Sequence, residues 1–365
     1  MTMPTAKPGV MAINPYIGGD SGLKGFERVL KLSSNEGAFG PSPKAASAYR
    51  DISETLHLYP DGGMDDLRQA IGTVHGLAAE QIVCGAGSDE IISLLCQAYA
   101  GEGDEVLYSE YGFLMYNISA KAAGATPVTA PETDLTANVD ALLAAVTENT
   151  HLLFLANPNN PTGTYLPHSE VARLRDGLRD DVLLVIDAAY AEYVTRENYS
   201  EGNALVDAGN NVIVTRTFSK IHGLGGVRLG WAYGPANVID VLNRVRGPFN
   251  VGSAALAAGT AAIQDGAFTE KVRAHNLKWL AWTREQLLDL GLDVTDSVGN
   301  FLLVCFGEHP ERTAKDADAA LKAEGIIVRG MAGYGLPDCL RITVGLEEDM
   351  RAVVGVLRKF MGKNQ

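Results

Sequence analysis

The chain has 365 residues, more than one ordinary domain contains, so we expect one large domain and a smaller one. Its formal net charge is −14, from 30 Lys and Arg against 44 Asp and Glu, which argues against nucleic acid or an anionic membrane as a partner. The first ten residues lack the apolar core of a signal peptide, and no window is apolar enough to span a membrane. These features predict a soluble, cytoplasmic protein.

The four cysteines are scattered along the chain and mostly flanked by apolar residues: Cys84, Cys96, Cys305 and Cys339. None has the Cys-x-x-Cys spacing of a zinc site, so we expect no metal. In a reducing cytosol, buried free thiols are favoured over disulfides. We therefore expect free, buried cysteines.

The middle of the chain alternates short apolar runs with helical patterns, which predicts an α/β fold with a mostly parallel, seven-stranded sheet flanked by helices. The expected strands are 81–84, 105–108, 126–129, 151–156, 182–186, 211–215 and 229–233. Helices are expected at 89–100, 139–146 and 167–178, where apolar residues recur at spacings of three and four.

The first forty residues are rich in Gly and Pro, so we expect them to be irregular. From about residue 265 a long helical pattern leads to a second α/β region, with segments at 300–306, 314–322, 326–329 and 340–344 and a final helix from Glu348. The predicted division is an N-terminal arm associated with the small domain (1–45), a large cofactor-binding domain (46–264) and a small C-terminal domain (265–365).

The most informative residue is Lys220, in the run Thr217-Phe218-Ser219-Lys220 and shortly before Arg228. A lone lysine is usually a solvated surface residue, so the inference depends on these neighbours. An amine can form a Schiff base with an aldehyde, while hydroxyls and a guanidinium hold a phosphate. The cluster predicts a site for pyridoxal 5′-phosphate (PLP), with Thr217, Ser219 and Arg228 at the phosphate. Lys220 would then act as nucleophile and proton carrier.

The segment 85–90, Gly-Ala-Gly-Ser-Asp-Glu, lies between a predicted strand and a predicted helix. In an open parallel sheet, ligands bind at the carboxyl ends of the strands. Small residues there let backbone N–H groups and a helix N-terminus approach an anion. Ala86, Gly87 and Ser88 are therefore candidate phosphate ligands. A tight turn with Ser88 or Asp89 capping the helix explains the segment at least as well.

Two further polar clusters follow predicted strands. The loop 157–163, Asn-Pro-Asn-Asn-Pro-Thr-Gly, fits a tight turn, but its amides need hydrogen-bond partners, and Asn157 is a candidate donor to a ring oxygen of the cofactor. Asp187 ends the apolar run 182–186, where a carboxylate needs a positive partner such as the protonated pyridine nitrogen. Tyr190 is placed to share the ring oxygen with Asn157. For Asp187 alone, a helix cap or a loop ion pair is the alternative.

With these clusters the chain resembles the fold-type I PLP aminotransferases of the class I/II superfamily and, within it, the histidinol-phosphate aminotransferase branch. The most specific matching segments are 32–36, 59–62, 85–90, 157–163, 187–193 and 217–228. The resemblance implies that Lys220 binds PLP covalently, with Asp187 and Tyr190 as its catalytic companions. It also implies Tyr111 as the aromatic residue stacked on the ring. Tyr59 would reach the phosphate from a partner subunit, which implies a homodimer with a shared active site.

The resemblance implies a substrate site as well, in which Arg341 holds the substrate carboxylate or phosphate. The other implied substrate contacts are Tyr16, Asn35, Asn157, Asn300 and Arg329. Taken alone, Arg329 and Arg341 also fit as ordinary ion-pair residues, and Tyr16 as a packing residue. The chain departs from the family pattern at 37–39, Gly-Ala-Phe, and at His222, positions expected to border the substrate site.

The predicted activity is PLP-dependent transamination of L-histidinol phosphate with 2-oxoglutarate, a step of histidine biosynthesis. An aromatic aminotransferase acting on phenylalanine or tyrosine, alone or as a second activity, would use the same catalytic residues. A PLP-dependent threonine-phosphate decarboxylase on the same scaffold is a further alternative.

Overall fold

A computed structural model describes residues 4–15, 18, 22–26, 28–307 and 312–363. Its central sheet has seven strands in the order β2-β10-β9-β8-β7-β3-β4. They are β2 (Ile82–Gly85), β3 (Glu105–Ser109), β4 (Thr126–Ala130), β7 (Thr150–Ala156), β8 (Leu183–Asp187), β9 (Val212–Thr217) and β10 (Gly230–Tyr233). Only β10 runs antiparallel to its neighbours in this sheet. The seven predicted strands and the mostly parallel sheet are therefore confirmed.

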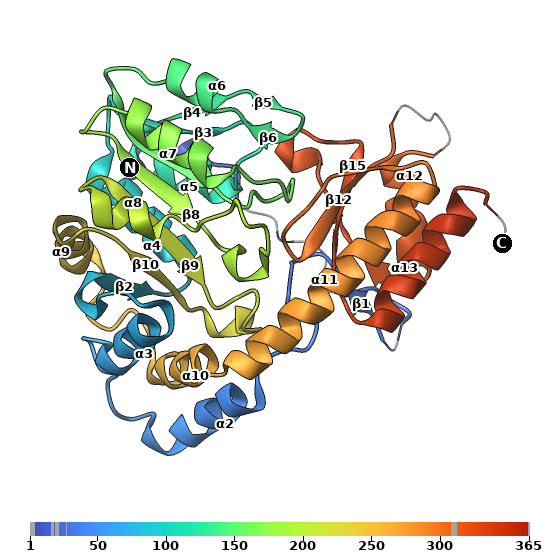
Figure 1. The fold of residues 1–365 in the computed structure, drawn as a ribbon, viewed down its shortest axis with the longest axis horizontal. Coiled ribbons are helices and arrows are strands. Elements are labelled where there is room, and N and C mark those ends of the chain that lie inside the picture. Colours follow the sequence, from blue (N-terminus) through green and yellow to red (C-terminus); the bar gives the residue numbers. More distant parts are fainter. Residues whose placement is uncertain (1–3, 16–17, 19–21, 27, 308–311, 364–365) are drawn as a thin grey trace.

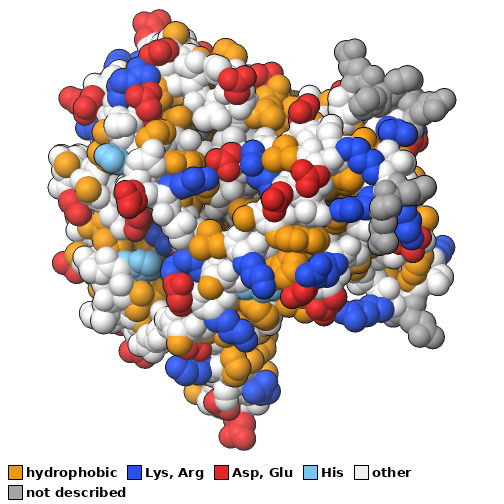
Figure 2. All heavy atoms as spheres, turned by 45° about the vertical axis from the view of Figure 1, so that its right-hand side comes forward, with side chains coloured by type: hydrophobic (Ala, Val, Ile, Leu, Met, Phe, Trp, Pro, Cys, Tyr) orange, Lys and Arg blue, Asp and Glu red, His pale blue; other side chains and the backbone are white. Residues whose placement is uncertain are grey.

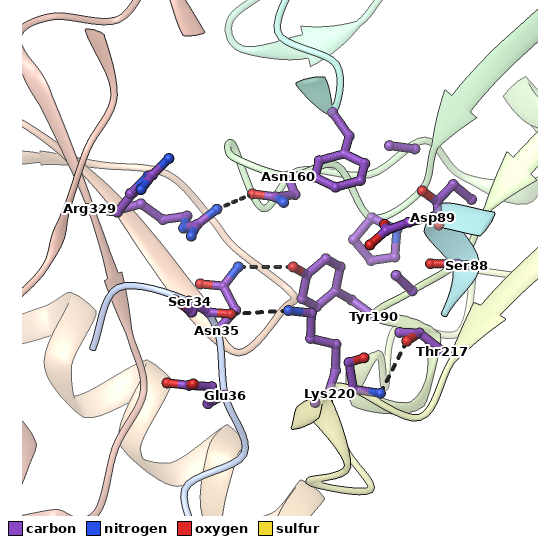
Figure 3. A pocket seen from close by; sticks show the side chains of 18 of the residues that line it. Ser34, Asn35, Glu36, Ser88, Asp89, Asn160, Tyr190, Thr217, Lys220 and Arg329 are labelled. Atoms are coloured by element: carbon purple, nitrogen blue, oxygen red, sulfur yellow. Dashed lines mark hydrogen bonds between the residues drawn. The ribbon is translucent and has the colours of Figure 1, made fainter. Parts of the chain in front are cut away.

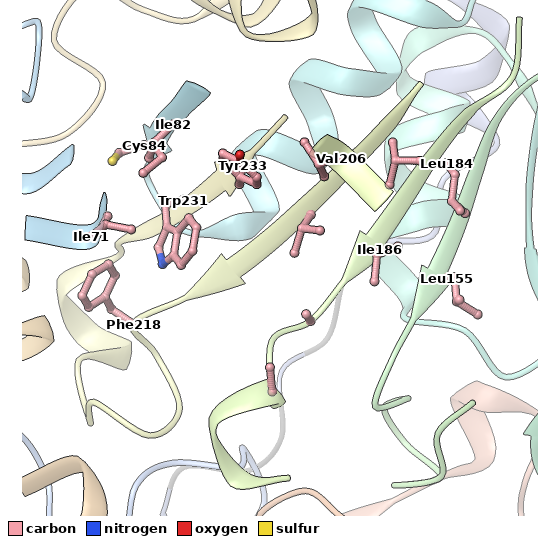
Figure 4. Packing of buried hydrophobic residues seen from close by; sticks show 14 of the residues in the cluster. Ile71, Ile82, Cys84, Leu155, Leu184, Ile186, Val206, Phe218, Trp231 and Tyr233 are labelled. Carbon is pink, nitrogen blue, oxygen red and sulfur yellow. The ribbon is translucent and has the colours of Figure 1, made fainter. Parts of the chain in front are cut away.

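Helices cover both faces of the sheet (Figure 1). They are α3 (Asp65–His75), α4 (Ser88–Tyr99), α5 (Leu114–Ala123), α6 (Val139–Ala144), α7 (His168–Gly177), α8 (Asn203–Ala208), α9 (Ala236–Val245) and α10 (Ser253–Ile263), and α2 (Pro43–Asp51) packs on α10. Successive residues of a strand point to opposite faces, so β8 packs Leu184 and Ile186 into one core and Leu183 and Val185 into the other. This explains why the strands read as continuous apolar runs. Figure 4 shows Leu184 and Ile186 beside Leu155 and Val206.

A smaller antiparallel sheet, in the order β11-β12-β15-β14, packs with three helices around its own core. Its elements are α11 (Gly266–Asp289), β11 (Asp293–Val294), β12 (Phe301–Cys305), α12 (Ala314–Ala323), β14 (Arg329–Gly330), β15 (Cys339–Thr343) and α13 (Glu347–Phe360). In the N-terminal arm, β1 (Leu30–Lys31) pairs with β13 (Ile326–Ile327) of this smaller unit. The arm otherwise holds one short helix among its described residues, α1 (Pro8–Met11). The boundaries at 45 and 264 stay predictions.

The expectation of free cysteines is correct for one pair and wrong for the other. Cys84 and Cys96 are buried free thiols, whereas Cys305 and Cys339 form a disulfide. The two bonded cysteines are direct partners in the pairing of β12 with β15, which brings their Cα atoms to 4.1 Å. A sequence separation of 34 residues concealed this proximity, because only the strand register creates it.

Acidic and basic side chains are interspersed over the face of the molecule in Figure 2, and neither sign forms one continuous patch there. In the part of the chain that the structure describes, no helix combines the length and the apolar character needed to cross a membrane.

Candidate active site

A cavity of about 280 Å³ lies where the carboxyl ends of β8 and β9 face the small sheet and residues 33–36 of the N-terminal arm. Figure 3 shows Lys220 entering it from the side of the large sheet and Arg329 from the opposite side. The cavity brings together ten of the residues singled out from the sequence: Asn35, Ser88, Asp187, Tyr190, Thr217, Ser219, Lys220, Arg228, Arg329 and Arg341.

Lys220 follows β9 and places its amine in the cavity. The amine donates to the carbonyl of Ser34 at 3.1 Å and lies 5.7 Å from the centre of the Tyr190 ring. Burial, with the positive charge of Arg341, lowers the pKa of this amine to about 8. A substantial fraction is then neutral near physiological pH, and only the neutral amine is a nucleophile.

The loop after Lys220 is held by close backbone contacts with the N-terminal arm. A β-carbon on Gly37 would lie 3.0 Å from the Lys220 carbonyl oxygen, and one on Gly223 only 2.2 Å from the Gly40 carbonyl oxygen. Gly223 also has φ +66°, a conformation that favours glycine. The absence of a side chain at Gly37 therefore permits the arm to pack directly on the lysine loop.

Asp187 is the last residue of β8 and is buried. Its carboxylate accepts hydrogen bonds from the Tyr116 hydroxyl at 2.8 Å and from the Thr215 hydroxyl at 3.3 Å. No basic side chain among the described residues forms an ion pair with it. Burial raises its pKa to about 6. The structure thus holds a costly buried carboxylate at the cavity wall with no cation of its own.

Tyr190 and Asn157 each have hydrogen-bond partners within the protein. The Tyr190 hydroxyl accepts from the Asn35 amide at 2.9 Å. The Asn157 amide donates to the Leu166 carbonyl at 3.1 Å and accepts from the Leu166 N–H at 2.8 Å. Asn157 does not line the cavity, although its neighbours Pro158 and Asn160 do. One amide hydrogen of Asn157 is left for a ligand, and its predicted contact with the cofactor stays a prediction.

The expected phosphate end of the cavity is built around Arg228. Its guanidinium donates to the Ser219 hydroxyl at 3.4 Å, to the Gly225 carbonyl at 3.0 Å and to Asp89 at 3.0 Å. Gly87 has φ +87°, and a β-carbon there would lie 2.4 Å from the guanidinium. The Ala86 N–H already donates to Glu90 at 2.6 Å, so it is not directed at the cavity.

The two arginines of the small sheet lie side by side, because Arg329 of β14 is the register partner of Arg341 of β15. Arg341 is buried and donates to the Asn160 side chain and, at 2.8 Å, to the Ser33 carbonyl. Asn300, directly before β12, donates to the Asn35 carbonyl at 3.0 Å. Two guanidinium groups thus face Lys220 across the cavity.

Several predicted site residues lie elsewhere. Tyr59 is 83% exposed and stacks on Phe249 at the surface. Tyr111 accepts a hydrogen bond from Asn159 through its backbone carbonyl and does not line the cavity, whereas Phe113 does; its predicted stacking on the cofactor ring stays a prediction. His222 is buried, with its ring centre 5.0 Å from that of Phe218; it does not line this cavity, and its place at the substrate site stays a prediction. Tyr16 falls outside the described residues.

The structure also adds residues that the sequence did not single out as ligands or supports. Asn160 holds Arg341, Asp89 holds Arg228 and Tyr116 holds Asp187. Asn160 and Asp89 lie in the segments 157–163 and 85–90, which were singled out from the sequence. The sequence therefore indicated their position near the site but not their hydrogen-bond partners. Tyr116 sits within an ordinary apolar helix pattern and gave no signal.

The class of protein follows from this fold and site together with known sequences. The family model of the aminotransferases of class I and II matches residues 27–357. The chain therefore belongs to the class I and II aminotransferases.

Among curated relatives, a histidinol-phosphate aminotransferase of Paramagnetospirillum magneticum is 63% identical over 99% of this chain and 100% of its own length. One from Rhodospirillum rubrum is 59% identical over 98% of this chain and 97% of its own. Among solved structures, the histidinol-phosphate aminotransferase of Sinorhizobium meliloti in complex with pyridoxal 5′-phosphate superposes with a TM-score of 0.91. It is 28% identical, covering 99% of this chain and 98% of that one.

Proposed function

We propose that this chain is a PLP-dependent histidinol-phosphate aminotransferase, which transfers the amino group between L-histidinol phosphate and 2-oxoglutarate. The observation that carries the proposal is the placement of the Lys220 amine, the buried Asp187 carboxylate and three arginines in one cavity. The full-length relatives that carry this name support the choice of substrate.

The residues present fit PLP. Asp187 forms no ion pair with the residues that the structure describes, and a protonated ring nitrogen would supply a cation. Arg228, Ser219 and Ser88 would hold the phosphate at the N-terminus of α4, where the helix dipole favours an anion. Tyr190 and Asn157 are proposed to contact the ring hydroxyl. When bound, PLP supplies an electron-withdrawing ring next to the carbon that loses its proton.

The chain's own residues would then carry the proton. Among the described residues that line the cavity, the Lys220 amine is proposed to take a proton from the substrate α-carbon and to return it one atom away. Because its pKa is lowered to about 8, this amine can both accept and release a proton near physiological pH. The hydrogen bond from Asn35 fixes the Tyr190 hydroxyl beside it.

The arginine pair explains how one pocket would serve two substrates. Histidinol phosphate carries a phosphate and no carboxylate, whereas glutamate and 2-oxoglutarate carry two carboxylates. A guanidinium binds either anion through two parallel hydrogen bonds. Arg329 and Arg341, with Asn35 and Asn300 as further contacts, are proposed to hold these groups opposite Lys220.

A half-reaction on the purified protein tests the proposal. Histidinol phosphate and phenylalanine are added separately at matched low concentration, and the visible absorbance of the bound cofactor is followed. Fast loss of absorbance with histidinol phosphate alone is expected. Loss with phenylalanine alone would favour the aromatic aminotransferase, and release of carbon dioxide from threonine phosphate would favour the decarboxylase. In Lys220→Ala, both the absorbance band and turnover should disappear.

We also propose a homodimer in which Tyr59 reaches the partner's phosphate site. Tyr59 lies among exposed apolar side chains, Leu56, Leu58 and Phe249, which a second subunit would cover. The proposed location is the cytoplasm. In that compartment the Cys305–Cys339 bond is expected to be reduced, and trapping the thiols in cell lysates would test this.

A further inference from the structure

We infer that Tyr116 is a positioning residue for the reaction, which holds the Asp187 carboxylate in the orientation that receives the cofactor ring. The inference rests on the proposed PLP site and adds a residue from outside the cavity. Tyr116 does not line the cavity, so it acts through Asp187 and not by touching a ligand.

The position of the Tyr116 hydroxyl is fixed by packing. Tyr116 is fully buried in α5, and its ring stacks on Phe154 of β7 with 4.6 Å between centroids and 9° between planes. The rings of Phe113 and Tyr108 meet it edge-on at 5.9 and 5.8 Å. These three contacts leave the ring one orientation. The hydroxyl that donates to Asp187 is therefore held in place by the packing of its own ring.

Tyr116 gives Asp187 its shortest side-chain hydrogen bond. The bond to Oδ2 is 2.8 Å long, whereas that from Thr215 to Oδ1 is 3.3 Å. Two donors, one on each oxygen, prevent the carboxylate from turning about its bond to the β-carbon. The carboxylate must keep one arrangement to accept a proton-bearing ring nitrogen from the cavity.

The bond also keeps Asp187 ionised. The titratable groups that face it are Tyr116 on α5, Asp89 on α4, and Tyr190 and Tyr199 beyond β8. Burial and the Asp89 charge raise the pKa of Asp187, and the Tyr116 hydrogen bond opposes them. Without that hydroxyl the carboxyl would take up a proton at a higher pH. A protonated carboxyl cannot attract a protonated ring nitrogen.

The test is the pH dependence of PLP affinity in Tyr116→Phe. Apoprotein is titrated with PLP between pH 5.5 and 8.5, and binding is followed by visible absorbance. A hydrogen bond to a charged group contributes roughly 1.5–3 kcal/mol, so the pH below which affinity falls should rise by about one unit or more. At pH 6.5 the dissociation constant should increase about tenfold, with a smaller increase at pH 8.5.

Tyr108→Phe is the matched control. Its ring touches Tyr116, but its hydroxyl accepts from Asn117 at 3.0 Å and does not contact Asp187. The pH below which PLP affinity falls should stay unchanged in this variant, while thermal stability should fall in both Tyr108→Phe and Tyr116→Phe. An equal shift in the two variants, or none in Tyr116→Phe, would overturn the inference.

Thr215→Val provides a second measurement in case Tyr116→Phe does not fold. This variant removes the longer of the two hydrogen bonds to Asp187. The pH below which PLP affinity falls should therefore rise, by less than in Tyr116→Phe. If that pH is unchanged in Thr215→Val, the inference is contradicted even without data for Tyr116→Phe. Failure of the wild-type protein to bind PLP would overturn the proposed function instead, so the two failures are distinguishable.

Discussion

Asp187→Asn should stabilise the cofactor-free protein at neutral pH, although Asp187 is proposed to be essential when PLP is bound. The carboxylate is buried without a cation, and its pKa is raised from 3.8 to about 6. A shift of about two units corresponds to about 3 kcal/mol of unfavourable interaction with the ionised form. Asparagine has nearly the same shape and carries no charge to bury.

The sign of the pH dependence follows from the direction of the shift. Because the folded-state pKa lies above the unfolded value, wild type is relieved of the penalty below about pH 4 and carries it fully above about pH 6. The free energy of unfolding of Asp187→Asn, relative to wild type, should therefore rise by about 3 kcal/mol between pH 4 and pH 7. Comparing the two pH values cancels the constant cost of the altered hydrogen bonds to Tyr116 and Thr215.

The assay is urea unfolding of both apoproteins, followed by circular dichroism at several pH values. Asp181→Asn is the control, because Asp181 is exposed and its pKa is lowered by Arg179, so its effect should have the opposite sign. A relative stability that does not change between pH 4 and pH 7 would refute the reasoning. With PLP bound, wild type should be more stable than Asp187→Asn, because the ring nitrogen then gives the carboxylate its cation.

Three further outcomes are expected. Gly87→Ala places a β-carbon 2.4 Å from a guanidinium nitrogen and should weaken PLP binding about tenfold, whereas Gly103→Ala, also at positive φ but in open space, should lower stability alone. The rate at which apoprotein takes up PLP covalently should rise with pH through about 8 and then level off, as the Lys220 amine loses its proton; stopped-flow absorbance measures it, and a flat profile would contradict it. The Cys305–Cys339 disulfide links residues 34 positions apart, so its reduction should lower the free energy of unfolding by at most about 4 kcal/mol. Denaturation with and without reductant measures this difference, and equal values would show that the two cysteines are already reduced.

The sequence by itself determined the large sheet and the general place of the site. Its central strands β7 and β8 are buried on both faces, so each reads as a largely apolar run that can be recognised without knowledge of its neighbours. Parallel strands share one carboxyl edge, and polar clusters following several strands therefore had to meet there. Lys220 and Asp187 could be brought together on this basis.

The tertiary structure alone decided which groups hold those residues in place. Tyr116 reaches Asp187 across 71 positions, Asn35 reaches Tyr190 across 155, and Asn160 reaches Arg341 across 181. None of these pairings leaves a periodic signal, because a hydrogen bond depends on how helices and domains pack and not on local spacing. The Cys305–Cys339 disulfide could not be predicted from the sequence for the same reason, because the register between β12 and β15 brings the two cysteines together. Local chemistry can be read along a chain, whereas the partners that tune it are fixed only when distant segments meet.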